Sequence, residues 1–135
     1  MSNNFKILKE NYHSKSDKSV IVAIVDGKSI ATMTDFYIQI GKQLHLPAYF
    51  GKNLDAFYDC LCDFSWLEVN HIQIILRHYD DFLSKEPALK KWDLLVVLND
   101  AVNEWKAMKG KDKVKLEILV EPSERIKKDL EDAEL

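Results

Sequence analysis

The sequence lacks the features that mark membrane and secreted proteins. Among its 135 residues, no apolar run approaches the roughly 18 residues that a bilayer-spanning helix needs. The first residues, MSNNFKILKENYHSKSDK, are polar and interrupted by charges, so they lack the apolar core of a secretory signal. These absences predict a cytoplasmic protein without a membrane partner.

Cysteine and glycine are also scarce. Cys60 and Cys62 are the only cysteines, and on a helix their side chains would point in different directions, so a disulfide between them is not expected. A single C-x-C pair with no adjacent histidine pair is a poor zinc signal. With only four glycines, the chain has no glycine-rich phosphate loop. The sequence therefore predicts reduced thiols, no metal and no cofactor.

Positive charge is missing from the middle of the chain. From Asn53 to Leu76 there is no Lys or Arg, although the formal net charge of the whole chain is only −3. Within this stretch Asp55, Asp59 and Asp63 recur every four residues, which would place them on one face of a helix. A broad basic footprint for nucleic acid is absent. The segment is instead expected to repel phosphate and to attract cations or a basic protein.

The hydrophobic pattern predicts one α/β domain. Short apolar runs at 19–25, 71–78 and 114–120 are typical of buried strands. Between them we expect a helix capped by Thr34, a loop in which Gly51 adopts a positive φ or permits a close approach, a helix capped by Asn53, and a long helix over 88–109. Strands separated by helices favour a small parallel sheet of three strands.

Three interpretations of the acidic segment remain open. The face could simply be solvated, because like charges four residues apart on a helix cost only about 0.2–0.5 kcal/mol per pair. It could instead bind a basic protein, since uncompensated acids beside aromatic residues are typical of a protein-binding hot spot. Catalysis through Asp55 and Asp59, with or without a divalent metal, is the least favoured, because no histidine partners them. The aromatic residues that crowd this region are Tyr49, Phe50, Tyr58, Phe64 and Trp66.

The stretch LPAYFGKNLDAFYDCL closely resembles the signature of the barstar family of intracellular ribonuclease inhibitors, L-P-x-Y-[YF]-G-x-N-L-D-A-[LFW]-x-D-x-L. The resemblance covers about residues 19–120. It implies a three-stranded parallel sheet packed with about four helices. The flanking segments are additional to the family pattern: residues 1–18 are expected to be an N-terminal extension or an added edge element, and residues 121–135 a charged C-terminal tail or loose helix. The matching residues are Leu46, Pro47, Tyr49, Phe50, Gly51, Asn53, Leu54, Asp55, Ala56, Phe57, Asp59 and Leu61.

The resemblance also implies a function. Members of this family cover the active site of a secreted, basic ribonuclease made by the same cell, and their carboxylates take the place of RNA phosphate. By position, Asp59 enters the phosphate site, Asp55 is a second interface acid, and Tyr49 stacks on a catalytic histidine of the nuclease. The other implied contact residues are Gly51, Asn53, Leu54, Tyr58 and Asp100.

Two contact positions differ from the inhibitor after which the family is named: Tyr58 stands where that protein has Trp, and Asp100 matches a family Glu. The implied function is inhibition of a barnase-type ribonuclease, which makes the protein a binding module and not an enzyme. The alternative is an immunity or adaptor protein that binds a different basic toxin or protein, such as a toxin nuclease domain. For either function we expect no nucleic-acid contact and a monomer when free.

Overall fold

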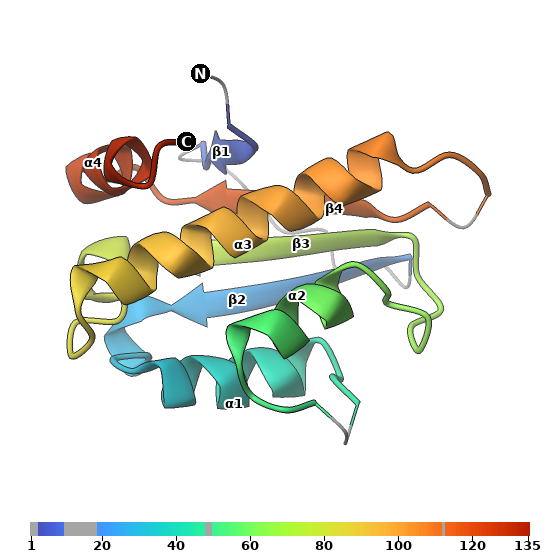
Figure 1. Ribbon diagram of the computed structural model, residues 1–135, viewed down its shortest axis with the longest axis horizontal. Coiled ribbons are helices and arrows are strands. Elements are labelled where there is room, and N and C mark those ends of the chain that lie inside the picture. Colours follow the sequence, from blue (N-terminus) through green and yellow to red (C-terminus); the bar gives the residue numbers. More distant parts are fainter. Residues whose placement is uncertain (1–2, 10–18, 48–49, 112) are drawn as a thin grey trace.

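The computed structural model describes residues 3–9, 19–47, 50–111 and 113–135. At its centre is one parallel sheet in the strand order β1-β4-β3-β2 (Figure 1). The strands are β1 (Phe5–Ile7), β2 (Val20–Asp26), β3 (His71–Arg77) and β4 (Lys115–Val120). The α/β class and the three strands read from the sequence are confirmed.

The predicted number of strands was wrong by one. β1 adds a fourth strand at the edge, where Phe5 lies opposite Ile118 and Ile7 lies opposite Val120. A strand of three residues is too short to show a period in the sequence, so its partner decides its conformation. The N-terminal segment was expected to be an extension or an added edge element, and β1 is the second of these.

Four α-helices accompany the sheet: α1 (Met33–Gln43), α2 (Leu54–Leu61), α3 (Ala88–Ala107) and α4 (Glu124–Asp132). In Figure 1, α1, α2 and α3 lie on one face of the sheet. Alternate residues of β3, such as Ile72 and Ile74, are buried beneath them because successive strand side chains point to opposite faces. Within the described residues, every helix is too short or too polar to cross a membrane.

The start of α1 differs from the prediction. Thr32, and not Thr34, is the N-cap, and its hydroxyl oxygen accepts a hydrogen bond from the Asp35 amide at 3.1 Å. The Glu86 carboxylate accepts a second bond from the Met33 amide at 2.8 Å. This tertiary contact satisfies a free N–H at the helix start, and nothing in the local sequence indicates it.

The long helix predicted over 88–109 is confirmed as α3. Its buried residues include Leu94, Leu98, Ala101 and Trp105, which recur at the spacing that favoured a helix. The segment expected to be a charged tail or loose helix contains α4, with Ile126 and Leu130 buried against the main core. The division of the chain at residues 18 and 120 stays a prediction.

Glu117 joins three strands on the sheet face opposite the main core. Its carboxylate accepts hydrogen bonds from Lys6 Nζ at 2.6 Å and Gln73 Nε2 at 3.2 Å, and it pairs with His71 Nε2 at 2.5 Å. Burial raises the pKa of Glu117, but the bonds from Lys6, His71 and Gln73 outweigh it and lower the pKa to about 2.

We therefore expect an acid-dependent loss of stability that involves Glu117. A carboxyl group whose pKa drops from 4.5 to about 2 on folding stabilises the protein above 4.5 and loses that contribution as the pH falls toward 2. Urea unfolding measured at several pH values should show this fall, and Glu117→Gln should flatten it. An unchanged pH slope in the variant would contradict the assignment.

Candidate protein-binding site

The signature segment forms a loop that leads into α2. The Phe50 amide donates a hydrogen bond to the Pro47 carbonyl at 2.9 Å. The Phe50 ring packs edge-on against Tyr37, with ring centroids 5.7 Å apart, so the loop is attached to the core. Tyr49, which the resemblance places against a nuclease histidine, lies outside the described residues.

Asn53 is the N-cap of α2, as predicted. Its Oδ1 accepts a hydrogen bond from the Ala56 amide at 2.8 Å, and its Nδ2 donates to the Gly51 carbonyl at 3.3 Å. The left-handed residue of the loop is Lys52, with φ 53°, and not Gly51. Gly51 fits the second role expected of it, because a Cβ there would lie only 3.2 Å from Asn53 Nδ2.

Loss of this cap should be measurable. Asn53→Ala removes the acceptor for the Ala56 amide, so we expect a loss of about 1 kcal/mol in the free energy of unfolding. Asn53→Asp is the matched control, because aspartate caps helices as well as asparagine does. Urea unfolding of the three proteins distinguishes them. Equal stability of the alanine variant and the wild type would show that the cap contributes nothing.

The acidic side chains Asp55, Asp59 and Asp63, called here the acidic face, are all exposed. Asp55 and Asp59 lie on α2, whereas Asp63 lies just beyond its last residue. Phe50 and Cys60 contribute, with Asp59, Asp63 and Ala56, to a hollow of about 170 Å³. No ion pair within the described part of the chain involves any of the three acids. No described base of the chain therefore compensates the acidic face.

Two acids of α3 extend this negative region. Tyr58 is half-buried on α2, and its hydroxyl donates to the Cys62 thiol. Burial, the bond to the Cys62 thiol, and the carboxylates of Glu104 and Asp100 together raise the pKa of Tyr58 to about 12, with burial the largest cause. Both carboxylates are exposed on α3, so the two helices present acids to one region.

Glu104 was not among the residues predicted for the site. Its carboxylate, like that of Asp100, raises the pKa of the Tyr58 hydroxyl, so it also lies within electrostatic reach of α2. Its position four residues after Asp100, on the same face of a helix, was the signal available in the sequence. The Trp105 Nε1 donor, 2.6 Å from the Leu61 carbonyl, fixes α3 against the end of α2.

The two cysteines are free. Burial raises the pKa of the Cys60 thiol, and the nearby Asp63 and Asp59 charges raise it further. Burial also raises the pKa of Cys62, against an opposing hydrogen bond from Tyr58, and the charges of Glu104, Asp59 and Asp100 add to the rise. Both side chains are therefore neutral thiols at neutral pH and poor nucleophiles.

The structure brings most of the predicted contact residues together. Asp55, Tyr58 and Asp59 share α2, Leu54 is half-buried at its start, and exposed Gly51 and Asn53 precede it. Asp100 lies across from them on α3. Among the described residues, no three His, Cys, Asp or Glu side chains are placed to hold a metal ion, so Asp55 and Asp59 have no third ligand there. The arrangement suits contact with a positively charged surface.

These features define a class: a small α/β module whose exposed helix carries acids that no base of the described chain neutralises. Residues 20–121 match the family described as Barstar (barnase inhibitor). The chain belongs to this family. It is also 28% identical over 83 residues to the "Putative ribonuclease inhibitor YrdF" of Bacillus subtilis (strain 168), covering 62% of this chain and 87% of that protein.

Proposed function

We propose that this protein inhibits a basic, barnase-type ribonuclease by covering its active site with the acidic face, and so protects the cell that makes the enzyme. The observation that carries the proposal is the acidic face itself. Three exposed carboxylates stand at the start and end of one short helix, and no described Lys, Arg or His forms an ion pair with them. Membership of the Barstar family supports the same function.

The proposed mechanism has an approach step and a docking step. At long range, the field of the acidic face draws a positively charged partner toward the correct side of the inhibitor. On contact, Asp59 enters the site that normally holds an RNA phosphate, and the nuclease cations donate hydrogen bonds to it in the absence of water. Asp59 is suited to this role because it is exposed at the rim of the hollow beside Phe50.

The surrounding residues fix how the partner docks. Gly51 and Asn53 hold the loop against the start of α2, so backbone groups of the loop can meet the nuclease in one conformation. Tyr58, on α2, lies within electrostatic reach of Glu104 and Asp100 on α3. Asp55 and Asp100 flank Asp59 on the two helices and contact cations at the rim of the interface, where charges affect association rate more than affinity.

The target could also be a different basic toxin with a nuclease domain. Tyr58 and Asp100 support this second candidate, since a tyrosine and a shortened acid replace barstar's own Trp and a family Glu at two contact positions. Both candidates use the same acidic face, and they differ in the enzyme that is blocked. A panel of basic nucleases, assayed one at a time with the purified protein, separates them.

Competition at the active site tests the proposal. A mononucleotide that occupies the phosphate site of the ribonuclease should raise the apparent Kd of the inhibitor linearly with nucleotide concentration, as simple competition requires, measured by isothermal titration calorimetry. An apparent Kd that does not depend on nucleotide concentration would show that the inhibitor binds away from the active site.

A further inference from the structure

The edge strand β1 covers only half of β4. Its register pairs Phe5, Lys6 and Ile7 with residues 118–120. The first half of β4, from Lys115 to Glu117, therefore has no partner strand on that side within the described chain. Because a short edge strand leaves backbone donors and acceptors unpaired, this half of β4 is a template for further strand pairing.

The backbone of Leu116 faces the open side. Lys115 donates its amide to Asn70 on the β3 side at 2.8 Å, whereas Val120 accepts from the Leu8 amide on the β1 side at 2.8 Å. Alternate residues of a strand direct their N–H and C=O groups to alternate edges. Leu116 therefore directs both groups toward the β1 side, beyond the end of β1.

Asn4 is the residue that ends the β1 ladder. If the ladder continued, the Asn4 amide would donate to the Leu116 carbonyl, but it donates to Asn99 Oδ1 of α3 at 2.9 Å. The Asn4 side chain also donates to Asn103 Oδ1 at 2.8 Å. These bonds draw the chain away from the sheet plane and toward α3. The Leu116 carbonyl is thereby left without the donor that the parallel pattern would supply.

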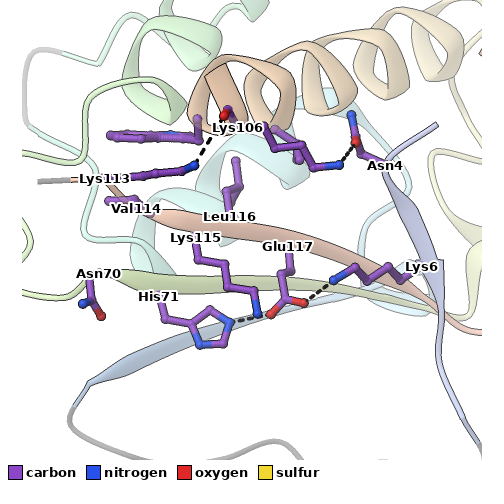
Figure 2. Close-up of a pocket in the computed structure, with 12 residues that line it drawn as sticks. Asn4, Lys6, Asn70, His71, Lys106, Lys113, Val114, Lys115, Leu116 and Glu117 are labelled. Carbon is purple, nitrogen blue, oxygen red and sulfur yellow. Dashed lines mark hydrogen bonds and ion pairs between the residues drawn. The ribbon is translucent and has the colours of Figure 1, made fainter. Parts of the chain in front are cut away.

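A cavity of about 570 Å³ lies at this open edge (Figure 2). On the α3 side its lining includes the apolar residues Val102, Trp105 and Leu116, beside Lys106 and Asn4. In Figure 2, Leu116 points toward α3, whereas His71 and Glu117 point to the other side of the sheet. The cavity thus lies on both sides of the β4 edge. The side chains of one added strand would occupy both sides in the same way, because they alternate between the two faces of the sheet.

The charge of this cavity is the reverse of the charge of the whole protein. Four lysines line it, and the single acid in its lining, Glu117, is already bound by Lys6 and His71. In the described part of the chain, no carboxylate forms an ion pair with Lys106, Lys113 or Lys115. A local excess of positive charge in a chain of net charge −3 favours an anionic ligand.

We propose that the open edge of β4 binds an extended peptide segment of a partner protein, with alternating apolar and acidic residues, as an added strand. The peptide backbone pairs with the N–H and C=O of Leu116. Its apolar side chains face Val102 and Trp105, and its acidic side chains face the lysines. Main-chain bonds supply affinity in this mode of recognition, and the alternation of side chains supplies specificity. A small anion would leave the Leu116 carbonyl unpaired, so a peptide is the better fit.

Lysines at a sheet edge also have a purely protective role, since they discourage edge-to-edge aggregation. The two roles predict different behaviour toward peptides. A protective edge rejects any added strand, whereas a binding edge accepts an acidic one and rejects a basic one. The site is separate from the acidic face, so the proposal does not depend on the identity of the nuclease.

The probe is a fluorescein-labelled hexapeptide of alternating glutamate and valine, titrated with the whole protein and followed by fluorescence anisotropy. We expect saturable binding, roughly tenfold weaker for Lys113→Glu/Lys115→Glu. The matched control, Lys127→Glu/Lys128→Glu, reverses two exposed lysines on α4 and should bind like the wild type. Circular dichroism confirms that each variant is folded. In a nitrogen-15 NMR spectrum, the Leu116 amide should shift on binding.

Several outcomes would overturn the proposal. Absence of saturable binding would assign the lysines a protective role only. If a lysine–valine peptide bound as tightly as the glutamate–valine peptide, the acidic side chains would not be recognised. If a peptide with its glutamates in one block and its valines in another bound equally tightly, the alternation would not be recognised. If inorganic phosphate displaced the peptide completely, and the Leu116 amide signal did not shift when the peptide bound, the cavity would be a small-anion site instead.

Discussion

Replacement of Asp59 by alanine should weaken the complex with a basic ribonuclease by about 3–5 kcal/mol, which is more than a hundredfold in Kd. The reason lies in the partner as much as in Asp59. The cations of a ribonuclease phosphate site lose most of their hydration in the complex, and without the carboxylate they remain buried and unpaired. Calorimetric titration of the nuclease with each inhibitor measures the loss.

A matched control separates this effect from a general loss of negative charge. Asp132 is also exposed, but it ends α4 and lies outside the acidic face. Asp132→Ala should change the affinity by less than about 1 kcal/mol, as is usual for exposed charges. Because Asp59 forms no ion pair in the described chain, its variant should keep the wild-type stability. If Asp59→Ala reduced the binding free energy by less than about 1 kcal/mol, Asp59 would not lie at the centre of the interface.

Replacement of Asp129 by alanine should destabilise the fold by about 3–5 kcal/mol. Asp129 is only 6% exposed, and its carboxylate lies 3.6 Å from the ammonium group of Lys91, which is 7% exposed. The Tyr79 hydroxyl donates to Asp129 at 2.8 Å, and Trp92 Nε1 donates at 3.4 Å. Without the carboxylate, the buried Lys91 charge loses its ion-pair partner and the two donors lose their acceptor.

Urea unfolding should show this loss for Asp129→Ala, while Asp132→Ala stays within about 0.5 kcal/mol of the wild type. The double variant Lys91→Met/Asp129→Leu removes both charges and fills the space with apolar side chains. It should recover much of the lost stability, because a buried ion pair is often no more stable than apolar residues of similar volume. Equal destabilisation of the single and double variants would mean that the ion pair is not the cause.

Local signals in the sequence were sufficient to predict the helices and strands at the centre of the molecule. The three apolar runs, the spacing of Leu94, Leu98, Ala101 and Trp105, and the Asn53 cap each depend on neighbours within a few residues. Such signals survive in the fold because burial of an apolar face and satisfaction of free amides are local requirements. The same holds for the acidic face, whose exposure follows from the burial of the opposite side of α2.

The features that the sequence did not predict all depend on distant contacts. The choice of Thr32 over Thr34 is supported by Glu86, which lies more than fifty residues away. β1 exists as a strand because β4 offers an edge, and α4 is held partly by the buried contacts of Asp129 with Lys91 and Tyr79. The proximity of Glu104 to Tyr58 likewise depends on how α3 crosses α2. Apart from the spacing of four residues between Asp100 and Glu104, these contacts leave no periodic or compositional trace in the chain.

Titration of a basic, barnase-type ribonuclease with this protein tests the central claim most directly. When the enzyme concentration is well above the Kd, the rate of RNA hydrolysis should fall linearly as inhibitor is added and reach zero at one inhibitor per enzyme. The Asp59→Ala variant should not give this sharp end point. Full ribonuclease activity in the presence of excess wild-type protein, across a panel of basic ribonucleases, would contradict the account.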